Sequence, residues 1–277
     1  MRLNSFIKAQ LRKQLFTYHT SLWKPPLKRE MDFLDLTVKG LNNIRISHGS
    51  QTVSSRCKRI HLTPKVSFFR NPLTTISPTT TELSDLLLVV KYFENGSLKQ
   101  FRAILGQIKF TSQKPKSWHI DTDQFFLMTQ WPRFTIVSPA RFRSTFHIKP
   151  KTSTWSSYGF IGPLATRFPI YHSAQRILKK KTLIPKTQSF SFNPRPPSGW
   201  DSSPSFMIKF LQGLIGENLL KNKSALALIR ALYIIAKWKV DPPDELEWIS
   251  DKDAESNGMG IIEFTVNTEK ESEQEIT

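Results

Sequence analysis

The sequence predicts an α+β domain, an antiparallel sheet with flanking helices, between a mobile basic N-terminal arm and an acidic C-terminal tail. Three observations lead to this class. The 277 residues are 39% hydrophobic and include 20 Phe and 7 Trp, which is enough for a large core. Several short apolar runs alternate as strands do, whereas residues 206–240 carry apolar residues at helical spacing. The predicted divisions are the arm (1–30), the domain (31–266) and the tail (267–277).

The arm is expected to form a short amphipathic helix that ends at Lys24-Pro25-Pro26, because proline cannot continue a helix. The apolar residues that recur at helical spacing are Phe6, Leu11, Leu15 and Phe16. Two interpretations stay open for this helix. Either it packs on its own domain, or it binds a membrane surface or a partner, for which its cationic polar face is suited.

Residues 32–70 predict strands, because their apolar residues alternate imperfectly. A buried helix is expected from Thr81 to Asn95-Gly96, since the run Leu86–Tyr92 is apolar on most sides. Residues 101–108 fit a helix or a strand. Residues 117–149 predict strands, at Phe125–Met128, at Phe134–Val137 and again between Phe142 and Ile148.

Residues 150–205 are rich in Ser, Thr and Pro and are interpreted as a basic insertion, linker or exposed loop. Two helices follow, Phe206–Leu220 and a second that Ser224 caps and that runs to Trp238. The last predicted strands are Leu246–Ile249 and Ile261–Val266, joined through a turn at Asn257-Gly258.

Charge is distributed unevenly along the chain. Lys and Arg number 40 against 22 Asp and Glu, for a formal net charge of +18. Residues 241–277 hold twelve acidic and two basic residues, a net charge of −10, which leaves 38 basic and 10 acidic residues, or +28, in residues 1–240. Because solubility alone needs a charge of only about 2 to 8, this excess predicts a polyanionic partner.

The single cysteine, Cys57, excludes a disulfide within one chain and indicates a reducing compartment. It lies among basic residues but has no base partner in the sequence, so it is interpreted as a bystander thiol. The N-terminus lacks the apolar run of a secretory signal, and no apolar stretch reaches the roughly 20 residues that a transmembrane helix needs.

Catalytic signatures are missing from the sequence. It contains no Gly-x-x-x-x-Gly-Lys-Ser/Thr loop, no Gly-x-Gly-x-x-Gly and no Gly-x-Ser-x-Gly, and its six histidines are scattered singly. A protein that is not an enzyme, with no cofactor, no metal and no small-molecule substrate, is therefore expected. The enzymatic alternative requires a deep pocket with converging polar groups.

Three regions interleave basic and aromatic residues: the arm, residues 133–151 and residues 176–186. Such pairs bind anionic lipid, or single-stranded nucleic acid whose bases stack on the aromatic rings, and the sequence does not separate these partners. Candidate membrane-binding residues are Lys8, Arg12, Lys13, Trp23 and Lys24. Candidate nucleocapsid- or polyanion-binding residues are Arg141, Arg143, Lys179, Lys180 and Lys181; the lysine triplet also fits a nuclear localisation patch. Candidate self-association residues are Phe6, Leu11, Leu15 and Phe16.

Three segments resemble those of rhabdovirus matrix proteins. Residues 81–106, which begin Thr-Glu-Leu-Ser-Asp-Leu-Leu-Leu-Val-Val, resemble that family's central helix and following apolar segment. Residues 136–148 look like its Phe-Arg-x-x-Phe-x-Ile strand, and Ala231–Trp238 with Leu246–Ser250 resembles its closing helix and strand. The budding motifs Pro-Pro-x-Tyr and Pro-Thr/Ser-Ala-Pro, frequent in that family's arm, do not occur here.

The resemblance implies a viral matrix-like structural protein that acts in virion assembly and budding. Such a protein would bridge an anionic membrane and an RNA nucleocapsid on the inner face of the envelope, in the host cytoplasm and at its membranes, and would form homo-oligomers, which multiply weak membrane contacts. The alternative is a soluble RNA-binding, movement or accessory protein that acts on single-stranded nucleic acid. The acidic tail is expected to screen the basic body before assembly.

Overall fold

The computed structural model describes residues 3–21, 29–60, 63–70, 77–111, 117–162, 170–181, 187–192, 201–237 and 258–269, without the side chains of 19–21, 181 and 201–203. Its helices and short 3₁₀ turns are α1 (Ser5–Ser21), α2 (Glu30–Leu41), α3 (Thr122–Gln130), η1 (Ala140–Phe142), α4 (Ala174–Lys181), α5 (Ser203–Leu211), η2 (Leu219–Lys221) and α6 (Lys223–Ile235). Its strands are β1 (Arg45–His48), β2 (Gln51–Ile60), β3 (Lys65–Phe68), β4 (Thr79–Glu82), β5 (Leu86–Glu94), β6 (Ser97–Phe110), β7 (Trp118–Asp121), β8 (Phe134–Ser138), β9 (Thr145–Phe146), β10 (Ser156–Ile161), β11 (Ile170–Ser173), β12 (Ser189–Phe192), β13 (Asp201–Ser202), β14 (Glu217–Asn218) and β15 (Met259–Thr268).

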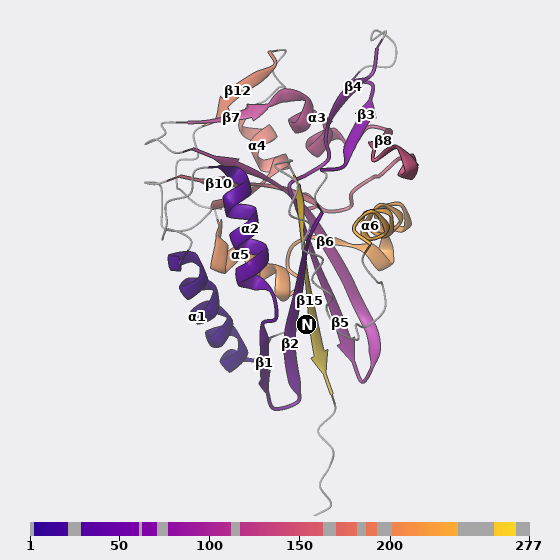
Figure 1. Cartoon of the computed structure of the whole chain (residues 1–277). Coiled ribbons are helices and arrows are strands. Elements are labelled where there is room, and N and C mark those ends of the chain that lie inside the picture. The colour runs from indigo at the N-terminus through magenta and orange to yellow at the C-terminus, as the bar shows by residue number, and fades with distance from the viewer. Residues whose placement is uncertain are drawn as a thin grey trace, which may run out of the picture.

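A mixed sheet forms the centre of the molecule (Figure 1). Its strand order is β1-β2-β15-β5-β6-β10-β11-β13, and β14 adds to β6. The pairs β15–β5 and β10–β6 are parallel, and the other pairs are antiparallel. The α+β class is therefore confirmed, with six α-helices in the described residues and a mostly antiparallel sheet.

Helices cover both faces of this sheet. One face packs against α1, α2 and α5 through residues such as Leu88, Val90 and Phe264. The other face packs against α3, α4, α6 and a small sheet of order β4-β3-β8-β9, through residues such as Leu87 and Val89. Successive residues of β5 thus enter different cores, as expected where side chains alternate along a strand.

This two-sided burial explains why the predicted helix at 81–96 is wrong. Residues 86–94 form β5, which lies between β15 and β6 with helices on both sides. A strand buried on both faces is continuously apolar, and periodicity alone does not distinguish it from a buried helix. Asn95 and Gly96, with φ of 50° and 72°, form the β5–β6 hairpin turn instead of a helix end. The expectation of a central helix, taken from the resemblance, fails at the same place.

Other expectations are corrected in the same way. Residues 30–41 form α2, not a strand, and its buried residues Phe33, Leu34, Thr37 and Leu41 recur at helical spacing. Phe125–Met128 belongs to α3, whose first turn is capped by the Asp121 carboxylate, which accepts a hydrogen bond from the Gln124 N–H (2.8 Å).

The second half of the chain also departs from expectation. The described parts of 150–205 supply β10, β11 and β13 of the main sheet and helix α4, so they are not an irregular insertion. Helix α5 ends at Leu211 rather than Leu220, and Asn222, not Ser224, caps α6. The strands predicted at 134–137 and 261–266 and the helix before Trp238 are confirmed, whereas Leu246–Ile249 lies outside the described residues.

Candidate functional site

A polar pocket opens where the N-termini of α2 and α3 meet strands β3, β4 and β6. It encloses about 360 Å³. The residues that line this pocket, called the polar pocket below, are Glu30, Lys65, Thr80, Thr81, Glu82, Gln107, Lys109, Asp121 and Gln124. Its lining comprises three carboxylates, two ammonium groups, two amides and two hydroxyls.

Asp85 lies behind this pocket, immediately before β5, and is buried. Its Oδ2 accepts hydrogen bonds from the Ile108 N–H (2.7 Å) and from the side-chain amide of Gln107. Gln124 of α3 in turn donates to Oε1 of Gln107 (2.6 Å). Strand β6 therefore presents Gln107 and Lys109, two residues apart and on one face, between a buried carboxylate and a helix.

Burial raises the pKa of Asp85 to about 7. The carboxylates of Glu30 and Glu82 raise this pKa further, whereas Lys109 and the Ile108 N–H lower it. Three acidic groups from three different elements therefore lie within electrostatic reach of one another. Asp85 itself does not line the pocket, and buried structural networks raise the pKa of a carboxyl group as functional sites do.

Tyr158 of β10 stands beside this group. The parallel register pairs Tyr158 with Gln107, so both side chains lie on the same face of the sheet. Its hydroxyl is fully buried and has no hydrogen-bond partner among the described residues. Burial raises the pKa of Tyr158 well above 10, and the nearby charges of Asp121 and Asp85 raise it further.

A basic surface lies on the same side of the main sheet as the polar pocket. Its exposed residues come from the β8–β9 region, the segment after it, η2 and α6: Arg133, Arg141, Arg143, Lys149, Lys151, Lys221, Lys223 and Arg230. These eight residues are called the basic surface below. The Lys151 ammonium donates to the Lys221 carbonyl (2.9 Å) and Asn222 donates to the Lys149 carbonyl (3.1 Å), which joins the strand segment to α6.

The basic surface has no acidic neighbours along the chain. Residues 124–200 contain twelve Lys and Arg and no Asp or Glu, and the only acid in 202–240 is Glu217. Glu217 is buried, where it accepts hydrogen bonds from the backbone N–H groups of Lys151 and Thr152. Within the described part of the chain, none of the eight cations lies within ion-pair distance of a carboxylate.

The structure brings together some of the predicted binding residues. Arg141 and Arg143 lie in and after η1, and both are exposed. Lys179 and Lys180 lie on α4, on the same side of the main sheet but on a different helix, and are exposed as well. The side chain of Lys181 lies outside the described residues.

Of the residues predicted for membrane contact and self-association, those on α1 are partly exposed and partly buried. Arg12 and Lys13 are exposed and Lys8 is half-buried, whereas Trp23 and Lys24 lie outside the described residues. Leu11 and Leu15 are buried in the chain's own core against α2, α5 and the sheet, so the prediction that they form an available self-association face is wrong. Phe6 and Phe16 remain 44% and 51% exposed. The described part of the arm, residues 3–21, thus packs on its own domain.

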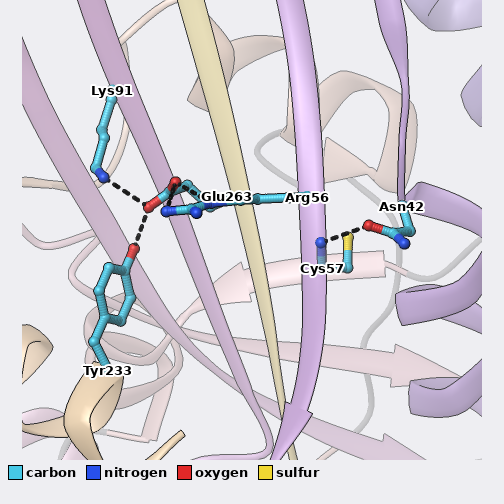
Figure 2. Close-up of polar contacts among 6 residues, drawn as sticks. All are labelled: Asn42, Arg56, Cys57, Lys91, Tyr233 and Glu263. Carbon is cyan, nitrogen blue, oxygen red and sulfur yellow. Dashed lines mark hydrogen bonds and ion pairs between the residues drawn. The ribbon is translucent and has the colours of Figure 1, made fainter. Parts of the chain in front are cut away.

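A buried ion-pair network on β15 fixes α6 to the sheet (Figure 2). The Glu263 carboxylate, 2% exposed, pairs with Arg56 of β2 (2.7 Å) and Lys91 of β5 (3.1 Å) and accepts a hydrogen bond from the Tyr233 hydroxyl of α6 (2.6 Å). On the other side of β2, the Cys57 N–H donates to the Asn42 side chain, and burial raises the pKa of the Cys57 thiol. The Arg56, Lys91 and Tyr233 contacts all converge on the Glu263 carboxylate. The Tyr233 hydrogen bond holds α6, and with it the α6 residues of the basic surface, on the sheet.

Sequence reasoning missed the polar pocket. A usable signal was present, because Asp85, Gln107 and Lys109 interrupt or border two otherwise apolar strands. Buried polar residues in apolar strands need partners, so they mark either a network or a site. With a helix expected at 81–96, Asp85 would lie at the start of that helix rather than directly before a buried strand. Its burial was therefore not expected.

Comparisons of the chain with models of known protein families, with curated proteins and with solved structures found no match. No helix among the described residues is long and apolar enough to span a membrane.

Proposed function

We propose that this protein binds nucleic acid through the basic surface. The observation that carries the proposal is the separation of charge described above: eight exposed cations lie on one side of the main sheet, and none of them has a carboxylate within ion-pair distance among the described residues. Phosphate groups are the polyanion that such a surface fits, since each Lys or Arg that contacts a phosphate releases a condensed counterion. The ring of Phe142, over which the Arg141 guanidinium lies (4.9 Å), offers a partly exposed stacking face beside these cations.

The test is a charge-matched comparison. The variant Arg141→Ala/Arg143→Ala/Lys149→Ala removes three cations from the basic surface. The control Arg12→Ala/Lys13→Ala/Lys39→Ala removes three exposed cations from α1 and α2, which cover the opposite face of the sheet. Each lost phosphate contact to a single strand removes about 0.7 decades of affinity at roughly 0.1 M salt, so the first variant is expected to bind about 100-fold more weakly. Fluorescence anisotropy with single-stranded RNA, single-stranded DNA and duplex DNA measures the affinity.

If the control triple weakens binding as much as the basic-surface triple, net charge rather than this surface governs binding, and the proposal is wrong. Circular dichroism and thermal melting of both variants verify that they fold.

A second candidate function is peripheral membrane attachment in a viral matrix-like assembly. One observation favours it: the outer face of α1 exposes Phe16 beside Arg12 and Lys13, a combination suited to an anionic lipid interface. It predicts flotation with liposomes that contain phosphatidylserine but not with neutral liposomes. Flotation that single-stranded RNA fails to prevent would favour this candidate over the first.

A further inference from the structure

A second pocket lies beside the basic surface, between the end of α3, the segment that leads into β10, and α4. It encloses about 320 Å³, near the lower end of the usual range for ligand pockets, which suits a small ring system. The residues that line this pocket, called the tryptophan pocket below, are Met128, Thr129, Trp131, Pro150, Lys151, Thr152, Ser153, Trp155, Ser156 and Gln175. Lys151 belongs both to this lining and to the basic surface, so the two features adjoin.

The wall of the tryptophan pocket contains a hydrogen-bond donor that no described residue uses. The Trp155 side chain is 1% exposed, and its Nε1 has no hydrogen-bond partner among the described residues. The neighbouring Trp131, by contrast, donates from its Nε1 to the Ser156 hydroxyl (2.9 Å). Because an unpaired buried donor is costly, it marks a place where an acceptor from outside the chain is stabilised, either a ligand atom or a water.

The pocket also keeps one acceptor. Gln175 donates from Nε2 to the Thr129 carbonyl near the end of α3, and within the described part of the chain no group donates to its Oε1. Trp155 and Gln175 therefore offer one donor and one acceptor to a ligand. The other side chains of the lining include the apolar groups of Met128, Trp131 and Pro150.

The walls of the pocket are fixed by contacts within the chain. The Ser156 hydroxyl, which accepts from Trp131, donates in turn to the Met128 carbonyl (2.8 Å). The rings of Trp131 and Trp155 pack with their centroids 5.6 Å apart and an angle of 52° between their planes. Trp131 also ends α3, where its N–H donates to the Leu127 carbonyl (3.0 Å). A pocket held in this way loses little conformational entropy when a ligand binds.

These groups match an unpaired nucleobase. A base is a planar ring with donors and acceptors along its Watson–Crick edge, and proteins that recognise single strands bind this edge and pack aromatic side chains on the ring. In a duplex the same edge is engaged in base pairing, so only an unpaired base can enter the pocket. Lys149 and Lys151, both exposed, lie where the phosphates next to such a base would pass.

We infer that the tryptophan pocket binds one unpaired base of a single-stranded nucleic acid whose phosphates lie on the basic surface. This inference rests on the proposed binding of nucleic acid and assigns its substrate class, which is a single strand rather than a duplex. The Trp155 N–H donates to an acceptor on the base, and a donor on the base bonds to Oε1 of Gln175. Lys151 contacts the adjacent phosphate.

The experiment compares strands that differ in their bases but not in their phosphates. Fluorescence anisotropy measures the affinity of the full chain for oligouridine, for oligothymidine, for an abasic deoxyribose strand and for duplex DNA, all of equal length. The uridine and thymidine strands distinguish RNA from DNA as the source of the base.

Two variants alter the pocket without changing its charge. Ser153→Phe fills the pocket from an exposed position of its lining, and Trp155→Phe removes the N–H but keeps an aromatic ring. The matched control is Ser144→Phe, which adds the same ring at an exposed serine beside Arg143, outside the lining. Thermal melting verifies that each variant folds.

The wild type is expected to bind oligouridine or oligothymidine at least about tenfold more tightly than the abasic strand, as one bound base contributes. Ser153→Phe is expected to weaken binding of the base-containing strands about tenfold and to leave the abasic strand and the duplex unchanged. Trp155→Phe is expected to weaken the base-containing strands about fivefold, the usual effect of one lost hydrogen bond. Ser144→Phe is expected to behave as the wild type.

Two results would overturn the inference in different ways. If the wild type binds the strands, but Ser153→Phe and Trp155→Phe weaken none of them or weaken the abasic strand equally, the pocket holds no base. The inference then fails and the proposed function stands. If the wild type binds none of the strands and no duplex, the proposed function fails and the inference fails with it.

Discussion

Removal of the Glu263 carboxylate tests how much the buried ion-pair network on β15 contributes to the free energy of unfolding. The substitution Glu263→Ala deletes the anion that Arg56, Lys91 and Tyr233 share at 2.6 to 3.1 Å. The side chains of Arg56 and Lys91 are only 15% and 12% exposed, so water replaces this partner poorly. Removing one partner of a buried ion pair costs about 3 to 5 kcal/mol, because the remaining charge stays desolvated.

Urea unfolding followed by circular dichroism measures this free energy. Glu263→Gln, which keeps an acceptor for Tyr233 but loses the charge, is expected to lie between wild type and Glu263→Ala. Glu269→Ala, at an exposed position just after the same strand, is the control and is expected to change the free energy of unfolding by less than about 0.5 kcal/mol. If Glu263→Ala costs no more than the control, the network contributes nothing and the physical argument is wrong.

Three further predictions address other parts of the molecule. Folding raises the pKa of Asp85 to about 7, so the stability that this carboxyl contributes is present below about pH 4 and is lost as the pH rises through 7. The free energy of unfolding should therefore fall by about 4 kcal/mol over this range. Asp85→Asn should abolish the fall, which urea titrations at several pH values measure. Gly96→Ala, at a φ of 72° in the β5–β6 turn, should lower the free energy of unfolding by about 1 kcal/mol, and an unchanged value would contradict the turn assignment. Phe16→Ser should abolish flotation with anionic liposomes if α1 binds membranes; equal flotation would exclude that face.

The sequence was sufficient for features that depend on local pattern. The α+β class, α6 and β15 follow from apolar periodicity over segments long enough to show it. Burial on both faces made β5 indistinguishable from a helix, because a central strand between β15 and β6 carries no polar face. Likewise, α2 resembled a strand because Leu34, Leu36 and Val38 alternate with polar residues.

The candidate sites depend on contacts that no local pattern contains. Arg141 and Arg143 were predicted from composition, whereas the contact between the segment after β9 and the start of α6 arises from tertiary hydrogen bonds of Lys151 and Asn222. The polar pocket combines Glu30 with residues about 35 to 95 positions later in the chain, which only the tertiary fold brings together. The arm packs on its own domain, one of the two interpretations left open by the sequence, because Leu11 and Leu15 contact an apolar face of that domain.

The most direct test of nucleic acid binding by the basic surface is the salt dependence of affinity. With six to eight phosphate contacts, the logarithm of the association constant for single-stranded nucleic acid is expected to fall with the logarithm of salt concentration at a slope of about −4 to −6. The variant Arg141→Ala/Arg143→Ala/Lys149→Ala is expected to reduce that slope by about 2. A slope near zero in the wild type, or an unchanged slope in the variant, would contradict the assignment of this surface to nucleic acid.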